Sequence, residues 1–197
     1  DKTGDEPLSE ILKVYLKNKY DKPGNVYLGV VHRLDRPTSG VVLFAKTSKA
    51  LSRLNRIFAE RKSKKIYWAI VKKPAEDRGE LVHYLKRNPK QNKSVAHKNE
   101  VPDSKKAILS YRVLKHFDKY ALLEIMLKTG RHHQIRAQLA AMGCPIKGDL
   151  KYGFPRSNSE GGIHLHAREL KLEHPVRREE IKFVADPPTD ALWDLCV

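Results

Sequence analysis

The sequence of 197 residues is poor in cysteine and contains only Cys144 and Cys196. A pair of cysteines cannot form the disulfide framework of a small secreted domain, so this scarcity indicates a reducing compartment. The sequence also lacks any apolar run near the roughly 20 residues that a membrane-spanning helix needs. Its first residues are polar and acidic, unlike a signal peptide. We therefore expect a cytoplasmic protein that does not associate with a membrane.

Acidic residues are scarce relative to basic ones, since 23 Asp and Glu face 39 Lys and Arg and leave a formal net charge of +16. A positive field of this size concentrates polyanions, and nucleic acid is the commonest polyanion in a cell. Basic side chains are densest in residues 46–73, which contain one acid, and in residues 86–98, which contain none. Such a stripe is typical of a phosphate-binding face. The alternative is a solvated basic surface without a specific ligand, and charge alone does not separate the two.

Glycine and proline are not abundant either, at 11 residues each, while 40% of the residues are hydrophobic. This composition excludes a low-complexity chain and supplies enough apolar side chains for one sizeable core. The sequence shows no internal repeat and no clean linker. We therefore expect a single domain over residues 1–197.

The spacing of apolar residues predicts strands that cluster together with few helices between them. The expected helices are residues 7–20, a segment capped by Thr47 or Ser48, residues 132–142 and residues 189–196. The expected strands are residues 66–71, 108–117, 120–128, 168–172 and 181–184. The polar, proline-containing residues 88–103 are expected to form an exposed, mobile loop. This pattern favours the α+β class, with a largely antiparallel or mixed central sheet and flanking helices.

Residues 30–44 form the first segment that suggests chemistry. Two apolar, strand-like runs flank a polar insert that contains one carboxylate, Asp35, between Arg33 and Arg36. Neighbouring cations keep a carboxylate ionised, which suits a nucleophile or an anion-stabilising group better than a general acid. The alternative is an aspartate that bonds the local backbone of a turn between two strands.

Residues 128–153 form the second such segment. A strand is expected to end near Gly130, and the helix that follows opens with basic and amide side chains. A helix N-terminus favours anions, and Arg131, His132 and Arg136 add to that preference. Arg136 can also reach the core side of the helix, where its guanidinium can bind a buried carboxylate through two hydrogen bonds.

Together these segments resemble the RluA-type pseudouridine synthases, and the matches follow the family order over roughly residues 30–176. Residues 32–40, His-Arg-Leu-Asp-Arg-Pro-Thr-Ser-Gly, resemble the first signature and are the most specific match. The second large motif resembles residues 129–136, followed by residues 145–149 and 152–153. The weaker matches are a short Lys-x-Tyr-x-Ala strand at residues 65–69 and a C-terminal block at residues 164–167 and 174–175.

The resemblance implies a pseudouridine synthase-like fold and an enzyme that isomerises uridines in structured ribosomal or transfer RNA. Asp35 is then the catalytic residue and Arg136 the arginine that pairs with it, which keeps the carboxylate ionised. Tyr67 matches the aromatic residue that stacks near the target base and takes part in proton handling at carbon 5; without the resemblance it is a strand core residue. No cofactor is expected, because this isomerisation involves no net oxidation, hydrolysis or group donor.

RNA is the partner that the resemblance implies, and a base inside a helix must be flipped out before it can react. Arg33 matches the family residue that fills the vacated stack; the alternative is a phosphate contact or a surface cation. Leu34 and Leu150 are expected to form apolar walls of the pocket. Further RNA contacts are expected from basic side chains of the stripe and of the helix start, namely Lys62, Lys64, Lys65, Arg131 and His132.

The sequence departs from the family pattern at its start and inside the second motif. The strand with Lys-Pro-x-Gly that usually precedes the first motif is not found, and neither is an S4-type RNA-binding domain. We therefore expect the chain to be N-terminally incomplete. Ala137-Gln138 replaces the usual Val-His, which bears on substrate fit more than on chemistry. No obligatory protein partner is implied, and a monomer is expected.

Two alternatives to this reading concern the site. Four histidines suggest a metal cluster, but their spacing differs from the i, i+4 pattern of a helical zinc site, so no metal is expected: His132, His133, His164 and His166. The chain can also be a catalytically inactive RNA-binding module on the same fold. The intact set of Asp35, Tyr67 and Arg136 argues against that alternative.

Overall fold

The computed structural model describes residues 4–159 and 161–196. The chain divides into two compact units. The first is formed by residues 1–33, 42–62 and 173–180, and the second by residues 34–41, 63–172 and 181–197. The expectation of one domain stays a prediction. Among the described residues, no helix combines the length and apolarity needed to cross a membrane.

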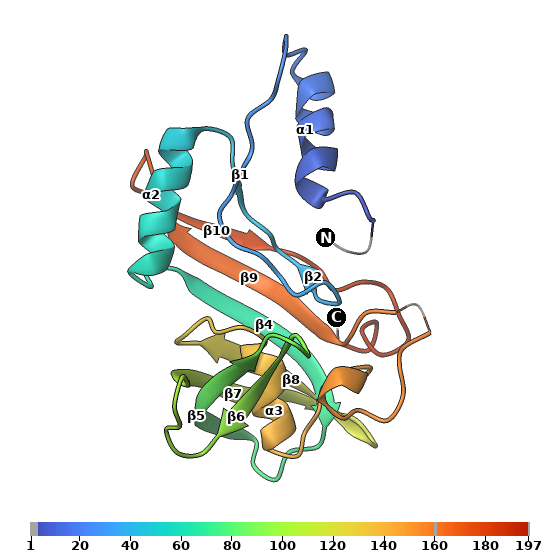
Figure 1. Cartoon of the computed structure of the whole chain (residues 1–197). Coiled ribbons are helices and arrows are strands. Elements are labelled where there is room, and N and C mark those ends of the chain that lie inside the picture. Colours follow the sequence, from blue (N-terminus) through green and yellow to red (C-terminus); the bar gives the residue numbers. More distant parts are fainter. Residues whose placement is uncertain (1–3, 160, 197) are drawn as a thin grey trace. The chain divides into compact units, whose positions relative to one another are not determined.

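The first unit contains two helices and a small antiparallel ribbon (Figure 1). Its helices are α1 (Leu8–Lys19) and α2 (Ser48–Ala59), and its ribbon pairs β1 (Gly29–Val30) with β3 (Phe44–Ala45). The Oγ1 atom of Thr47 accepts the N–H of Ala50 at 3.1 Å, which confirms the predicted cap of α2. The predicted helix at residues 7–20 is also confirmed.

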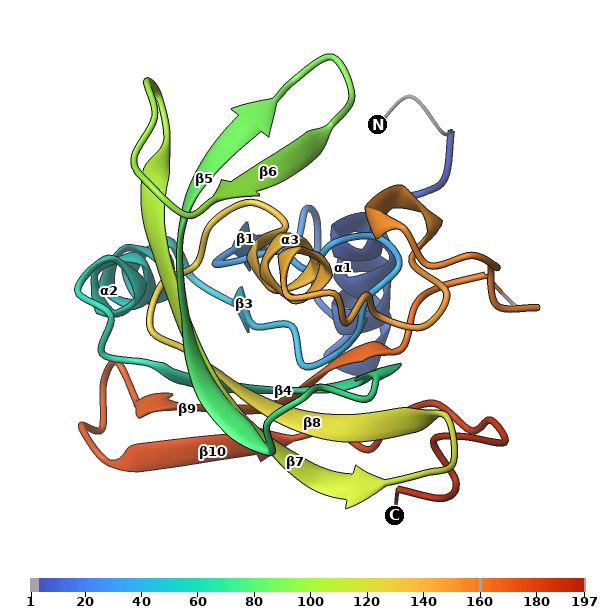
Figure 2. The ribbon, with the colours of Figure 1, turned by 90° about the horizontal axis from the view of Figure 1, so that it is seen from below.

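The second unit is built on a sheet of eight strands, which Figure 2 shows strongly curved. The strands follow the order β10-β9-β4-β8-β7-β5-β6, with β2 paired to β9. Pairing is antiparallel from β9 through β6, and parallel between β2 and β9. The bounds are β2 Ser39–Gly40, β4 Lys64–Lys72, β5 Arg78–Asn88, β6 Lys93–His97, β7 Lys105–His116, β8 Tyr120–Leu127, β9 Leu165–Glu173 and β10 Glu180–Val184. The predicted α+β class with a largely antiparallel, mixed sheet is confirmed.

The two faces of this sheet are covered by different parts of the chain. Helix α3 (Gln134–Ala141) lies within the curve of the sheet in Figure 2 and buries Ile135 and Leu139 in the main core. Trp193 of the C-terminal segment packs on Ile70 and Leu122 in a second cluster. Successive strand residues point to opposite faces, so β4 and β8 supply both clusters. The sheet is therefore buried on both sides at β4 and β8, and β4 is the neighbour of β9, which pairs with β2.

Three expectations from the sequence are wrong. The segment 88–103 is not a loop throughout, because residues 93–97 form β6, which pairs with β5 in a hairpin and buries Ser94. Residues 189–196 form turns rather than a helix: Asp194 N–H donates four residues back, to Asp190 O, but Cys196 N–H donates three residues back, to Trp193 O. Helix α3 begins after His133, and not at residue 132, because His133 has a left-handed backbone with φ +50°.

Candidate active site

The segment that carries Asp35 is fastened to β9. The Thr38 N–H donates to the Asp35 carbonyl oxygen at 2.8 Å, closing a turn, and β2 follows directly. Gly40 has φ +115°, and a Cβ at this position would collide with the backbone of Ala167. The Oγ atom of Ser39 lies 2.8 Å from Nδ1 of His166. A close backbone approach therefore fixes the position from which the Asp35 side chain projects.

Arg136 of α3 joins two carboxylates. Its Nη1 donates to Oδ2 of Asp35 at 3.2 Å. Its Nε and Nη2 bind the two oxygens of Asp149 at 2.7 and 2.8 Å. The Arg136 and Asp149 side chains are 5% and 1% exposed, whereas that of Asp35 is 27% exposed. Asp149 therefore holds the guanidinium in place, and Asp35 receives a single N–H while keeping contact with solvent.

His133 and Tyr152 complete the surroundings of Asp35. The Nε2 atom of His133 lies 3.7 Å from Oδ2 of Asp35, and its Nδ1 lies 2.9 Å from the hydroxyl of Tyr152. Burial, together with the positive charge of Arg136 and against the opposing effect of Asp35, lowers the pKa of His133 to about 4. The ring is therefore neutral at physiological pH, and Asp35 faces one permanent cation and one neutral imidazole.

Tyr67 lies on β4, between Ile125 of β8 and Ala167 of β9. Burial and the negative charge of Asp35 raise the pKa of Tyr67 to about 12. The structure therefore brings Asp35, Arg136 and Tyr67, the predicted catalytic set, into one electrostatic neighbourhood. The phenol keeps its proton at neutral pH, so it can stack or donate a hydrogen bond but is not a resident base.

The predicted RNA contacts near α3 are held by the β5–β6 hairpin and by β7. The Oγ atom of Ser94 lies 2.9 Å from Nδ1 of His132, and the Oδ1 atom of Asn92 lies 3.1 Å from its Nε2. Arg131 donates through Nε to the carbonyl of Lys106 at 3.2 Å. The hairpin therefore orients His132, and β7 orients Arg131, before any ligand binds.

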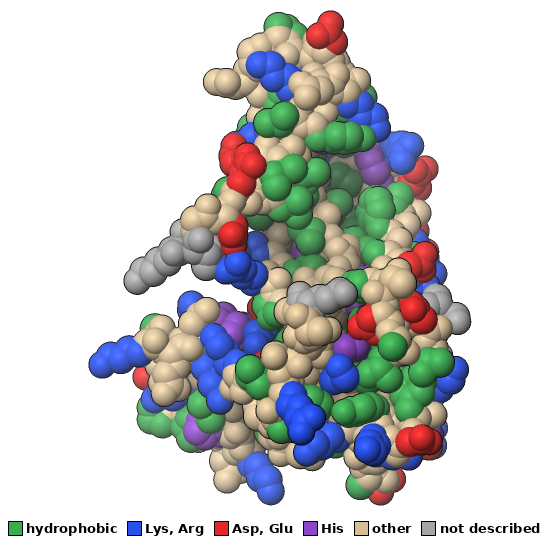
Figure 3. All heavy atoms as spheres, turned by 90° about the vertical axis from the view of Figure 1, so that its right-hand side faces the viewer, with side chains coloured by type: hydrophobic (Ala, Val, Ile, Leu, Met, Phe, Trp, Pro, Cys, Tyr) green, Lys and Arg blue, Asp and Glu red, His purple; other side chains and the backbone are tan. Residues whose placement is uncertain are grey.

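The other predicted contacts lie in different places. Arg33 is exposed in the first unit, where Lys62 pairs with Glu60 at 2.6 Å. Lys64 and Lys65 are consecutive on β4, so their side chains point to opposite faces of the sheet. Lys and Arg side chains are spread over the face in Figure 3 rather than gathered in one band. Contact of these residues with RNA stays a prediction.

Of the two predicted apolar walls, Leu34 is half-buried and Leu150 is 57% exposed. Leu150 opens the short 3-10 helix η1 (Leu150–Tyr152) directly after Asp149, so it lies beside the Arg136 anchor. Its exposed side chain leaves it accessible to a ligand. The assignment of these leucines as pocket walls stays a prediction.

Three residues around Asp35 received no role from the sequence: Asp149, His133 and Tyr152. All lie in segments that match the second motif, and each is less than a tenth exposed. Their place in those segments is the sequence signal that could have indicated a role. Without the motif, the Gly-Asp and Tyr-Gly pairs indicate turns. Their function becomes visible only through Arg136 and Asp35.

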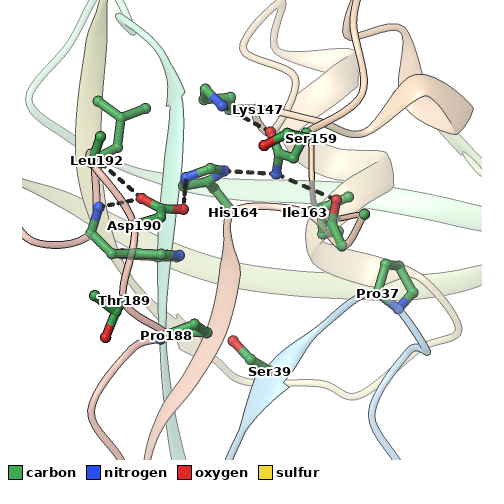
Figure 4. A pocket seen from close by; sticks show the side chains of 15 residues that line it. Pro37, Ser39, Lys147, Ser159, Ile163, His164, Pro188, Thr189, Asp190 and Leu192 are labelled. Carbon is green, nitrogen blue, oxygen red and sulfur yellow. Dashed lines mark hydrogen bonds and ion pairs between the residues drawn. The ribbon is translucent and has the colours of Figure 1, made fainter.

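A cavity of about 500 Å³ lies beside the same loop and is lined by Pro37 and Ser39 among others (Figure 4). A chain of polar contacts runs along it. Lys147 Nζ donates to Oδ1 of Asn158 at 2.8 Å, and Nδ2 of Asn158 lies 3.0 Å from Nδ1 of His164. Nε2 of His164 lies 2.9 Å from Oδ2 of Asp190. His164 and His166, two of the four histidines weighed as metal ligands, therefore have other partners here. The described residues contain no group of three His, Cys, Asp or Glu side chains placed to hold a metal ion.

Comparison with known proteins places this site in a family. The family model described as RNA pseudouridylate synthase matches residues 4–141. The chain therefore belongs to the RNA pseudouridylate synthase family. It is 39% identical over 168 residues to an uncharacterized RNA pseudouridine synthase of Chloroflexus aurantiacus, covering 85% of this chain and 52% of that protein.

Relatives with more specific names are similarly close. The chain is 36% identical to tRNA pseudouridine synthase C of Vibrio parahaemolyticus, covering 83% of this chain and 72% of that protein. It is 35% identical to ribosomal large subunit pseudouridine synthase D of Vibrio cholerae, covering 82% and 53%. The structure of human RNA pseudouridylate synthase domain containing 4 superposes with a TM-score of 0.80 at 26% identity, covering 98% of this chain and 84% of that one. The chain spans about half the length of several of its curated relatives.

Proposed function

We propose that this chain is the catalytic part of a cytoplasmic RNA pseudouridine synthase that acts on ribosomal or transfer RNA. The observation that carries the proposal is the arrangement of Asp35, a partly exposed carboxylate that receives one N–H from a buried arginine. The second carboxylate on that arginine, Asp149, has both oxygens bound to it. The names of two relatives supply the RNA classes, one ribosomal and one transfer.

The proposed reaction breaks the bond between carbon 1′ and nitrogen 1 of a uridine and turns the base. It then forms a bond between carbon 1′ and carbon 5, while carbon 5 releases a proton and nitrogen 1 gains one. Asp35 supplies the carboxylate that attacks the nucleoside or takes a proton from it. Tyr67 keeps its own proton, as its raised pKa requires, and stacks beside the base. No electron acceptor or group donor enters this balance, so the proposal includes no cofactor and no metal.

RNA binding in this proposal rests on the charge of +16 and on flipping of the target uridine, with Arg33 filling the vacated stack. Arg131 and His132 contact RNA beside the site, where the β5–β6 hairpin orients His132. A monomer suffices, because Asp35, Arg136 and Tyr67 all come from one chain.

The test is release of tritium from ribosomal and transfer RNA that is labelled at carbon 5 of uridine. We expect the chain to release tritium from at least one of the two RNA classes, and the Asp35→Asn chain to release none. Tritium release by both chains would contradict the role of Asp35. Binding of RNA by the unmodified chain with no tritium release from either RNA class would favour the inactive RNA-binding module. Mapping pseudouridine in cells that lack the protein identifies the uridine.

A further inference from the structure

The β5–β6 hairpin packs against α3 in Figure 2 and is tied to the segments that form the candidate active site. The Ser94 N–H donates to the hydroxyl oxygen of Tyr152 at 2.9 Å, and the Ser94 hydroxyl donates to the carbonyl of His132 at 2.8 Å. Lys151, the residue before Tyr152, donates through Nζ to the carbonyl of Asn92 at 3.3 Å. This end of the hairpin is therefore held in a fixed position beside the site.

Lys93 lies between these attachments and carries its ammonium to the ring of Tyr152. Its Nζ lies 5.1 Å from the ring centroid, and Cζ of Arg136 lies 5.0 Å from the same centroid. The distance between the ammonium and that guanidinium carbon therefore cannot exceed the sum of these two values. Arg136 in turn donates to Asp35 at 3.2 Å. Lys93 is thus a cation close to the candidate catalytic carboxylate, although it lies outside the family motifs.

The two cations near this ring differ in how their charge is neutralised. Arg136 binds the carboxylates of Asp35 and Asp149. Lys93 is half-buried, yet its ammonium has no hydrogen-bond acceptor among the described residues. An aromatic ring attracts a cation but leaves the three N–H donors of an ammonium unused. Because a partly desolvated charge is stabilised by a counter-ion, this ammonium is in place for an anion from outside the chain.

Other positive charges gather at the same end of the hairpin. Burial lowers the pKa of His132, and three nearby cations lower it further, against the negative charge of Asp35. These cations are Arg87, Arg136 and Lys151. Arg87 and Lys151 are exposed, and neither has a carboxylate partner in the part of the chain that the structure describes. Positive charge that the protein leaves uncompensated attracts the phosphates of a nucleic acid.

We propose that Lys93, with Arg87 and Lys151 beside it, binds the backbone phosphate of RNA directly next to the target uridine. The proposal rests on the proposed function, which brings that uridine to Asp35. A base and its phosphate are attached to the same sugar, so a base flipped toward Asp35 brings a phosphate to the edge of the site. A phosphate contact carries no sequence information, and its effect is to fix the position of the flipped nucleotide.

Ethylation interference tests this contact, because it removes the charge of one phosphate per RNA molecule at random positions. The RNA is the ribosomal or transfer RNA that the unmodified chain binds. We expect ethylation next to the converted uridine to weaken binding by the unmodified chain and to have no effect on binding by Lys93→Met. Met keeps an unbranched side chain that can lie on the Tyr152 ring but has no charge. Lys93→Arg keeps the charge and should restore the interference.

Affinity and turnover provide the second readout. Lys93→Met should lower RNA affinity and raise KM about three- to tenfold, and should reduce the salt slope by about one. Its kcat should change less than about threefold, because the contact is present both before and during the reaction. The matched control is Lys90→Met, an exposed lysine in the turn of the same hairpin. This variant should keep the interference next to the uridine.

Two results would overturn the proposal. One is an interference pattern that is the same in Lys93→Met and in the unmodified chain, which would assign Lys93 to packing on Tyr152. The other is a Lys93-dependent phosphate that lies several nucleotides from the converted uridine. A Lys93-dependent phosphate in RNA that is bound but not converted would support the phosphate site and count against the proposed function alone.

Discussion

Asp35 and Asp190 occupy two regions of the same structural unit and use their oxygens differently. Asp190, at the cavity in Figure 4, accepts the N–H groups of Leu192 and Trp193 on Oδ1, both at 2.8 Å, and lies against His164 with Oδ2. Burial acts in the opposite direction, but the two backbone hydrogen bonds lower the pKa of Asp190. Asp35 accepts one N–H, from Arg136. Saturated acceptors fasten a chain segment, whereas a carboxylate with spare acceptor capacity can engage a substrate.

Asp149 extends the comparison inside the site itself. It carries the same charge as Asp35 and binds the same arginine, but it is buried and both of its oxygens are occupied by Arg136. Its position is therefore suited to holding Arg136 rather than to reacting. The three aspartates therefore differ in how many hydrogen bonds their oxygens can still accept. Reactivity should be highest where most acceptor positions remain, at Asp35, and each residue can be tested separately.

The largest expected effect is that of Asp35→Asn. The variant keeps the side-chain size but loses the negative charge, so pseudouridine formation should become undetectable. RNA affinity should stay within about tenfold, or 1.4 kcal/mol, because phosphate contacts elsewhere dominate binding. A pseudouridine assay and a filter-binding curve on one RNA measure both quantities. A folded variant that no longer binds RNA would assign Asp35 to recognition instead of chemistry.

Arg136→Ala should rank next. It removes the N–H donated to Asp35 and leaves the Asp149 carboxylate buried without its partner, so unfolding free energy should fall by about 3–5 kcal/mol. Turnover at saturating RNA should fall at least about 100-fold in the protein that remains folded. Arg131→Ala is the control, because Arg131 binds the carbonyl of Lys106 and is expected mainly to weaken RNA binding. Equal losses of turnover in the two variants would refute the pairing role.

Asp190→Asn should separate fastening from chemistry. The variant weakens the contact with His164, and the acceptor of the turn's backbone N–H groups is no longer charged. The free energy of unfolding, measured with urea, should therefore fall by about 1 kcal/mol. Turnover per folded molecule should change less than about threefold. A collapse of turnover with normal stability would mean that the cavity belongs to the active site.

Acid should weaken the site through His133. Its pKa in the folded protein, about 4, lies below the ordinary value of 6.5, so the unfolded chain binds more protons between those values. The stability that depends on the neutral ring is therefore complete above pH 6.5 and falls as pH drops toward about 4. Thermal unfolding across this range should show a shallower pH slope in His133→Asn than in the unmodified chain. His97→Asn on β6 controls for the loss of an imidazole, and identical slopes in all three chains would count against the buried neutral ring.

The smallest expected effect concerns the basic stripe. Reversing the side-chain charge of Lys62, Lys64 and Lys65 should flatten the dependence of RNA affinity on salt, because each lost phosphate contact lowers the slope by about one. Lys64 and Lys65 point to opposite faces of the sheet. Reversing the charge of one of them alone should therefore change the salt slope more than reversing the other. Filter binding over a series of salt concentrations measures the slopes. Three unchanged slopes would place the RNA elsewhere on the protein.

The contact between Asp35 and Arg136 is predicted from the sequence because each residue lies in a motif, although 101 residues separate them. It does not predict Asp149 as the anchor, because a buried carboxylate in a Gly-Asp pair resembles any turn aspartate. Strand β6 escapes prediction because Lys-Ser-Val-Ala-His lacks a clear apolar alternation and becomes a strand only by pairing with β5. The helix expected at residues 189–196 is capped by Asp190 but does not continue, since the backbone hydrogen bonds change from four residues back, at Asp194, to three, at Cys196.

The pairing of β2 with β9 has a consequence for how the chain acquires activity. Ser39 and His166 are 127 residues apart, so the loop with Asp35 is fastened only after β9 has been synthesised and has closed a long loop. Contacts of such high sequence separation form late and slowly. A nascent chain that stops before β9 would hold Asp35 on an unfastened segment, even with α3 and Arg136 already complete. The geometry of the site therefore depends on β9, and a chain that stops before β9 carries the motif without that geometry.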